Sequence, residues 1–322
     1  MAHCRGKAVS PRLSVALCSF EGAQFLQQQL DSLLIQTRVP DELVVCDDGS
    51  TDGTVEILEE FARLSPFPVR IVRNPQRLGV AKNFELAISL CTGDVIALAD
   101  QDDVWHLAKL ERLARALSEA DLAFSDAEVV GEALKPLGYT MWQRVGFDEE
   151  EQARMSAGDA LGVLLKHGVI TGAATAFRVG LRPLLLPIPS NWPHDAWIAA
   201  VAASTGKLAP VKETLVQYRQ HQANMVGGMK KSLLRQIIEA LEVDRANYYC
   251  EEILRWQALR DRLSGTPDCS RLEAKLAHLK RRAGLPANRL FRLHPIAAEM
   301  ARGGYARYAR NWGSIALDLL VR

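Results

Sequence analysis

Several familiar signatures are missing from this 322-residue sequence. No Gly-x-Gly-x-x-Gly motif is present, which argues against a dinucleotide-dependent dehydrogenase. No Gly-x-x-x-x-Gly-Lys-Ser/Thr motif is present either, which argues against a P-loop NTPase. The six cysteines are scattered along the chain without any Cys-x-x-Cys spacing. We therefore expect them to be reduced core residues of a cytosolic protein.

Long apolar runs are also missing. No run reaches the roughly 18 apolar residues of a membrane span, and residues 1–12 contain no apolar core of a secretory signal. The sequence therefore predicts a cytoplasmic protein. Its composition, 48% hydrophobic and 24% charged residues, excludes disordered and fibrous classes and predicts one large core with a smaller annex.

The net charge of +1 hides an uneven distribution of charge. From Ser270 onward there are eleven lysines and arginines against three acids, a net charge of +8, whereas the rest has 28 against 35, a net charge of −7. Solvated helix faces could supply part of this excess. The basic tail, with its mixture of aromatic residues and arginines at 303–312, indicates peripheral binding to an anionic membrane surface. Nucleic acid is not expected as a partner, because the body is acidic and carries no nucleic-acid-binding motif.

The most informative stretch is 95–105, where five apolar residues lead into Asp100, Asp102 and Asp103. A continuous apolar run is typical of a central parallel strand, and ligands bind outside the carboxyl ends of such strands. Clustered acids repel one another unless a hard cation such as Mg²⁺ or Mn²⁺ neutralises them, and that cation needs only one or two carboxylates besides substrate phosphates. The alternative is that Asp102 or Asp103 caps a helix over 106–117.

Strand and helix patterns alternate through the first third of the chain. Apolar strands are predicted at 13–18, 43–46, 69–72 and 95–99, with amphipathic helices between them. This order favours an α/β fold with right-handed parallel crossovers and a nucleotide crevice.

Further along the chain the periodicity is weaker. We expect strands at 122–126, 170–177 and 215–221, a helix at 160–166, and an irregular acidic loop at 139–151 that lines a substrate cleft. The strand at 170–177 contains a glycine for close backbone approach, Gly172. Asp195 lies at the start of a helix and could simply cap it. His221, at a strand end, would on its own be read as a surface residue. Long amphipathic helices begin at Met229, with apolar stripes over 233–241, 253–263 and 272–279.

Seven ordered motifs together resemble the family 2 glycosyltransferases, especially their bacterial rhamnosyltransferase-like members, over about the first two thirds of the chain. The motifs are Ser14–Phe20, Val45–Asp52, Gly79–Phe84, Asp100–Trp105, Gly172–Phe177, His194–Trp197 and Tyr218–His221. The resemblance implies a GT-A fold with a Rossmann-like, mainly parallel sheet over 1–228. Residues 229–322 would then form a C-terminal α-helical region. The family often has Glu-Asp where this chain has His194-Asp195.

The resemblance also implies roles for particular residues. Asp195 would be the catalytic base, and Asp102, Asp100 and His221 would hold the metal, with Asp102 the more direct ligand. The residues expected to bind the nucleotide and donor are Ser19, Phe20, Glu21, Asp47, Asp48, Lys82, Asp100 and Gln101.

The chemistry of the residues agrees with this implication. The diphosphate leaving group of a nucleoside-diphosphate sugar needs Lewis-acid help, to which Lys82 could add a point charge. One base without a covalent nucleophile predicts direct displacement with inversion at the anomeric carbon. The resemblance implies a hexosyltransferase whose acceptor is a glycan or lipid-linked hydroxyl in bacterial cell-surface polysaccharide synthesis.

Two other functions remain open from the sequence. A sugar-phosphate nucleotidyltransferase would need an early glycine-rich loop with arginine and lysine, and residues 19–22 provide none. The other alternative is a non-catalytic module that binds a nucleotide sugar or a membrane.

Overall fold

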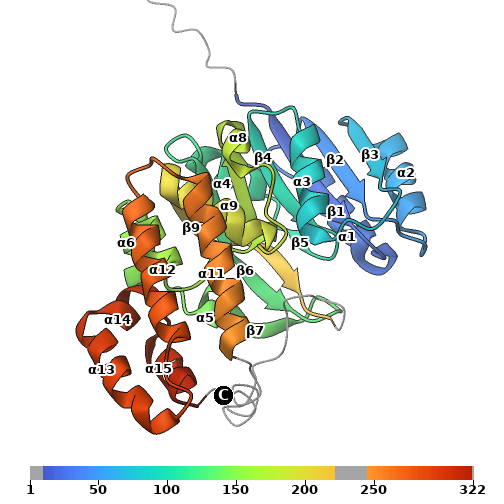
Figure 1. Ribbon diagram of the computed structural model, residues 1–322. Coiled ribbons are helices and arrows are strands. Elements are labelled where there is room, and N and C mark those ends of the chain that lie inside the picture. Colours follow the sequence, from blue (N-terminus) through green and yellow to red (C-terminus); the bar gives the residue numbers. More distant parts are fainter. Residues whose placement is uncertain (1–9, 222–244, 321–322) are drawn as a thin grey trace, which may run out of the picture.

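The computed structural model describes residues 10–221 and 245–320, which form a mixed sheet flanked by helices and a helical C-terminal region (Figure 1). The sheet has nine strands in the order β3-β2-β1-β4-β8-β6-β9-β5, and β7 pairs with β6. The predicted α/β class is therefore confirmed.

The first half of the sheet is the parallel part that the sequence predicts. Its strands are β1 (Leu13–Ser19), β2 (Glu42–Asp47), β3 (Val69–Arg73) and β4 (Val95–Asp100), connected by α1 (Ala23–Leu34), α2 (Thr54–Leu64) and α3 (Val80–Leu90). Cys18 of β1 is level with Asp100 of β4, and Ser19 is level with Asp47 of β2. The carboxyl ends of the three strands therefore meet at one edge.

The second half of the sheet mixes strand directions. It contains β5 (Val104–Trp105), β6 (Leu122–Val130), β7 (Pro136–Thr140), β8 (Thr175–Arg178) and β9 (Leu208–Arg219). Strand β8 lies antiparallel between β4 and β6, and β9 runs parallel to β6. The prediction of a strand from 170 was wrong at its start, because η1 (Gly172–Ala174) is a 3₁₀ turn. Gly172 does make a close approach: a Cβ there would lie 2.8 Å from Nε2 of His194.

The prediction of an irregular loop at 139–151 was also wrong. It contains α5 (Met141–Val145) and the start of α6 (Glu149–Ser156). Thr140 and Gln143 form a capping box at α5, and Gly146 ends that helix in a left-handed conformation. Each helix is too short to show a helical period, so the sequence pattern looks irregular.

The helix predicted over 106–117 is shorter than expected. Strand β5 comes first, and α4 (Lys109–Ala116) starts after Ala108, with no side-chain cap. The reading of Asp102 or Asp103 as its cap is therefore wrong. The remaining short elements are α7 (Ala160–Leu164), η2 (Val179–Leu181) and α8 (Arg182–Leu185). The predicted helix at 160–166 is thus present.

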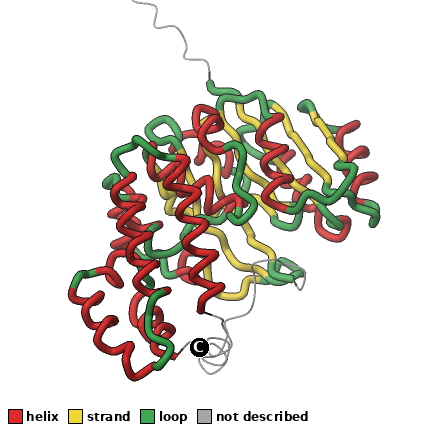
Figure 2. The backbone as a smooth tube through the Cα atoms, in the orientation of Figure 1, coloured by secondary structure: helices red, strands yellow, loops and turns green. Residues whose placement is uncertain are grey.

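Helices dominate the end of the chain, as Figure 2 shows. They are α9 (His194–Thr205), α11 (Arg245–Arg262), α12 (Cys269–Ala283), η3 (Arg289–Arg292), α13 (Leu293–Ala301), α14 (Gly304–Tyr308) and α15 (Asn311–Leu320). Trp256 of α11 stacks edge-on against Trp192, which in turn contacts Trp197 of α9, with ring centroids 5.5 and 5.7 Å apart. The apolar core is therefore continuous from the sheet into α11 and α12.

Some expectations fall on residues that the structure does not describe. The apolar stripe at 233–241 and the domain boundary at 228/229 lie outside the described residues, so the division into two domains stays a prediction. Within 10–221 and 245–320, no helix combines the length and the apolar character needed to span a bilayer. Cys18, Cys46 and Cys91 are buried free thiols, as predicted, whereas Cys250 is exposed and Cys269 half-buried.

Candidate active site

The predicted metal ligands come together at the carboxyl end of β4. Asp100 ends the strand, and Asp102 lies in the turn that follows it. Oδ2 of Asp102 lies 2.8 Å from Nε2 of His221, which follows β9. The His221 ring packs on Phe25 of α1, with centroids 4.7 Å apart. Two residues that are 119 positions apart in sequence therefore share one site.

The acids at this site repel one another. Burial, then the charges of Asp102 and Asp195, raises the pKa of Asp100 to about 7. Burial and the charges of Asp102 and Asp100 raise the pKa of Asp103 well above its usual value. These shifts mean that the surrounding protein does not neutralise the cluster.

A divalent cation fits this arrangement. Among the described residues, no group of three or more His, Cys, Asp or Glu side chains is placed to enclose an ion on its own. Mg²⁺ and Mn²⁺ do not require such a cage, because one or two carboxylates and the oxygens of a bound diphosphate complete their coordination. Asp102 and His221, whose side chains are 2.8 Å apart, could supply protein ligands, and the participation of Asp100 stays a prediction.

Asp103 holds the turn in place. Its Oδ1 accepts a hydrogen bond from the backbone N–H of Arg219, at 3.0 Å, and Arg219 Nε donates to the carbonyl of Asp102, at 2.7 Å. The buried Arg219 thus fastens the acidic turn to the end of β9. Sequence reasoning gave Arg219 no role, because nothing in its local pattern indicates that it reaches the turn.

Asp195 lies in the first turn of α9, facing the same site. Its Oδ1 accepts from the backbone N–H of Ala196, at 2.7 Å, and its Oδ2 accepts from Gly172 N–H, at 3.3 Å. The N-cap position belongs to Pro193, so Asp195 is not the cap residue. The charge of Asp195 raises the pKa of Asp100, which places the two carboxylates in one electrostatic environment.

His194 fixes the start of the same helix. Its ring stacks on Phe84 of α3, with centroids 3.9 Å apart. Burial lowers its pKa, while the charge of Asp195 opposes this shift. His194 is therefore a neutral packing residue at neutral pH, and it orients the turn that carries Asp195.

The predicted nucleotide residues Asp47 and Asp48 are buried, and each carboxylate organises a loop. Asp47 accepts from Ser19 Oγ, at 2.9 Å, and from the backbone and hydroxyl of Ser50. Asp48 accepts from the side chain of Asn74 and from two backbone N–H groups of the loop that precedes α3. Their direct contact with a base or ribose stays a prediction.

Two other predicted donor-binding residues, Phe20 and Gln101, are joined by a pair of hydrogen bonds. The Gln101 amide accepts from Phe20 N–H, at 2.8 Å, and donates to the Phe20 carbonyl, at 2.9 Å. This pair fixes the end of β1 against the acidic turn. A Cβ at Gly22 would lie 2.1 Å from Oε1 of Gln101, so a larger residue there would displace this side chain.

Glu21 and Lys82 are engaged with protein groups. Glu21 accepts from the backbone and hydroxyl of Thr51, at 2.9 and 3.0 Å. The Lys82 ammonium donates to Glu85 and to the Ile188 carbonyl, both at 2.7 Å. The predicted roles of Glu21 at the nucleoside and Lys82 at the diphosphate stay predictions.

Sequence reasoning also missed Lys109, the first residue of α4. Its side chain is fully buried, its ammonium donates to the carbonyl of Ala173 in η1, and it lies 3.2 Å from the centroid of the Trp105 ring. Burial lowers its pKa, and the charges of Asp103 and Asp100 oppose this shift. The buried Lys109 side chain therefore connects the acidic cluster to the turn beneath Asp195. A lysine in the first turn of a helix, where the dipole disfavours it, was the available signal.

Comparisons with known proteins agree with this geometry. The family model described as glycosyl transferase family 2 matches residues 14–182, more than half of the chain. An uncharacterized glycosyltransferase of Nostoc sp. is 26% identical over 222 residues, which are 66% of this chain and 66% of that protein. A Bacillus subtilis protein described as a putative teichuronic acid biosynthesis glycosyltransferase is 30% identical over 115 residues, 36% of this chain and 45% of that protein. The chain thus spans just under two thirds of the first of these relatives.

Among solved structures, a mannosyltransferase from Pyrobaculum calidifontis in complex with GDP-Man and Mn²⁺ has a TM-score of 0.56. Its sequence is 18% identical, and the match covers 97% of this chain and 86% of that one. This likeness confirms the predicted GT-A fold. With the family model matching the parallel half of the sheet and the acidic turn, the chain belongs to glycosyl transferase family 2.

Proposed function

We propose that the protein transfers a hexosyl group from a nucleoside-diphosphate sugar to an acceptor hydroxyl. The observation that carries the proposal is the meeting of Asp100, Asp102 and Asp195 at one edge of the sheet, where their charges act on one another. Membership of the family and the nucleotide-sugar complex of the Pyrobaculum calidifontis neighbour support it.

On the donor side, Asp102, Asp100 and His221 would hold Mg²⁺ or Mn²⁺. Such an ion, when bound, supplies Lewis-acid stabilisation of the departing diphosphate. Ser19, Phe20 and the loop of Asp47 and Asp48 end β1 and β2 next to the acidic turn, a position that suits the nucleoside. The nucleotide base and the sugar are to be found by screening, with rhamnose among the candidate sugars.

On the acceptor side, Asp195 would act as general base. Its carboxylate accepts the acceptor's proton as the hydroxyl oxygen bonds to the anomeric carbon, and the bond from that carbon to the diphosphate breaks. The attack comes from the face opposite the leaving group, so the configuration inverts. The hydrogen bond from Gly172 orients the carboxylate, because it holds Oδ2 in place.

The acceptor would be a glycan or lipid-linked hydroxyl in the synthesis of a cell-surface polysaccharide. The description of the Bacillus subtilis relative, a teichuronic acid biosynthesis protein, supports this class of acceptor.

The Asp195→Asn variant tests the proposal. The carboxamide keeps the shape of the side chain and its oxygen can still accept from Ala196, whereas the 3.3 Å bond from Gly172 is lost because an amide nitrogen cannot accept. Donor affinity should stay close to wild type, and the melting temperature should fall only slightly. Turnover should fall by roughly a hundredfold or more, because the amide cannot take the acceptor's proton. Turnover near the wild-type value would remove Asp195 as the base and direct attention to Asp126 or Glu128.

A further inference from the structure

Acids and bases are arranged asymmetrically in the last part of the chain. Residues 280–320 contain eight lysines and arginines but only two acids, Glu299 and Asp318, a net charge of +6. Both acids are buried, at 3% and 0% exposure. The negative charge of this region is therefore inside it.

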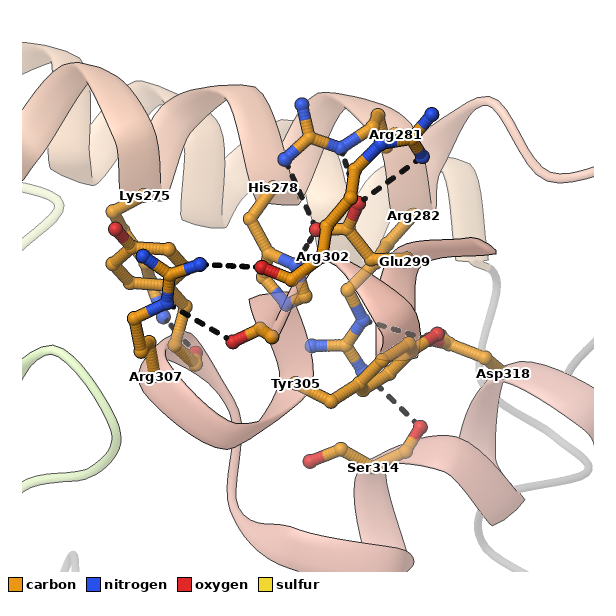
Figure 3. A network of polar contacts seen from close by, with 12 residues as sticks. Lys275, His278, Arg281, Arg282, Glu299, Arg302, Tyr305, Arg307, Ser314 and Asp318 are labelled. Atoms are coloured by element: carbon orange, nitrogen blue, oxygen red, sulfur yellow. Dashed lines mark hydrogen bonds and ion pairs between the residues drawn. The ribbon is translucent and has the colours of Figure 1, made fainter. Parts of the chain in front are cut away.

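Figure 3 shows how the two acids are held. Glu299 lies 2.6 Å from His278 Nδ1 and from Arg281 Nε, and Asp318 accepts from Arg282 Nε at 2.7 Å. These contacts tie α12, α13 and α15 together. The outer surface of the region is left with one sign of charge, carried by exposed residues such as Lys280 and Arg289.

The same surface carries exposed apolar side chains. Leu290, Phe291 and Leu293 are 77%, 69% and 61% exposed, and we call these three residues the apolar prong. On α13, Leu293, Ala297 and Met300 follow at helical spacing and are all exposed, while Ile296 points into the core. An apolar helix face beside cations is the pattern of an interfacial helix.

We propose that the apolar prong and the exposed cations of residues 280–320 dock on the surface of an anionic lipid bilayer. The prong would enter the headgroup region, while Lys280 and Arg289 meet lipid phosphates. The proposed contact lies at η3 and α13, and the expected contribution of the aromatic segment 303–312, where Trp312 is 75% exposed, stays a prediction. Tyr305 of that segment is buried and donates to Asp318.

A second copy of the chain is a poorer partner for this surface. A twofold contact would bring the same cationic surface against itself, which like charges oppose. Nucleic acid offers phosphates but no hydrocarbon phase for three aliphatic and aromatic side chains. An anionic bilayer satisfies both features at once.

Sedimentation of the full chain with lipid vesicles tests the proposal. Wild type should bind phosphatidylcholine vesicles that contain phosphatidylglycerol and should ignore pure phosphatidylcholine. Binding should be lost between about 0.01 M and 1 M salt, because the Debye length falls from roughly 30 to 3 Å. The assay contains no nucleotide sugar, so its outcome is independent of the proposed transfer reaction.

Two variants separate the apolar and the charged contributions. Leu290→Ser/Phe291→Ser should lower binding by about tenfold or more, whereas the control Ile35→Ser/Leu64→Ser, at positions 65% and 75% exposed, should bind as wild type. Lys280→Gln/Arg289→Gln should also lower binding by about tenfold and reduce its salt dependence.

Three results would overturn the proposal. One is equal binding by wild type and the prong variant. Another is equal binding to neutral and anionic vesicles. The third is binding to a DNA or RNA oligonucleotide without any binding to vesicles. Melting temperatures close to wild type would show that the exposed substitutions leave the fold intact.

Discussion

Two buried groups of acids in this protein differ in the charges around them and in the direction of their pKa shifts. In the C-terminal region, Glu299 and Asp318 each contact an arginine (Figure 3). Although burial opposes it, hydrogen bonds from Arg281 and His278 hold the pKa of Glu299 below its usual value. At the end of β4 the shift has the other sign, because burial and neighbouring carboxylates raise the pKa of Asp100 to about 7.

The difference separates a structural site from a functional one. Acids that are paired with arginines connect helices and need no ligand to balance their charge. Acids left to repel one another reduce the stability of the ligand-free protein, and such groups cluster where a ligand completes the charge balance. The proposed role of the β4 cluster, a site for a cation and a diphosphate, agrees with these raised pKa values. The C-terminal acids form ion pairs that connect helices.

The largest expected effect on stability comes from removing one of these C-terminal ion pairs, Arg282–Asp318. Asp318→Asn leaves Arg282 buried without its counter-charge, since the guanidinium donates to Oδ2 of Asp318. The free energy of unfolding should fall by about 3 kcal/mol. Urea denaturation measures it, with the exposed Asp31→Asn as the matched control. Equal stability of the two variants would contradict a stabilising role of the Arg282–Asp318 ion pair.

A smaller effect is expected at Lys109, the buried lysine beside the β4 cluster. Lys109→Met keeps most of the side-chain volume but removes the hydrogen bond to Ala173 and the charge that faces Asp103 and Asp100. We expect a loss of about 2 kcal/mol in the free energy of unfolding. Turnover should also fall, because η1 positions Asp195 through Gly172. An unchanged catalytic rate with the same loss of stability would limit Lys109 to a structural role.

A third expected effect is a pH dependence of stability. The pKa of Asp100 is raised, so the folded protein keeps a proton that the unfolded chain releases above about pH 4. The stability associated with this proton is present at low pH and is lost as the pH rises through about 7. In chelator, the melting temperature of wild type should therefore fall more steeply over this range than that of Asp100→Asn. Parallel curves would show that Asp100 does not titrate as the geometry requires.

The parallel half of the fold could be predicted from sequence because its signals are local. β1, β2 and β4 contain short apolar runs, β3 alternates apolar residues with arginines, and each connecting helix has its own period. The turn at 172–174 could not be predicted, because its shape depends on a close approach of Gly172 to the distant His194. The two helices within 139–156 could not be predicted, because each is too short to show a helical period.

The candidate site divides in the same way. The acids after β4 are visible in the sequence as a cluster, and the family resemblance added Asp195 and His221. The roles of Lys109 and Arg219 were not visible, since they depend on which carbonyl a buried side chain reaches across the fold. The ion pairs of Glu299 with Arg281 and of Asp318 with Arg282 were also not predicted. The burial of these two acids within the basic tail was therefore missed as well.

One measurement tests the claim that the β4 cluster is the metal and diphosphate site. Melting temperatures of wild type and Asp102→Ala are compared with and without Mn²⁺ and a nucleoside diphosphate. Ligand that binds only the folded state at about a hundred times its Kd adds about 2.7 kcal/mol of stability, so wild type should melt several degrees higher with both additions. Asp102→Ala should match or exceed the melting temperature of ligand-free wild type, because one repelling charge is gone, and should gain nothing from the additions. An equal ligand-induced shift in both proteins would contradict the account.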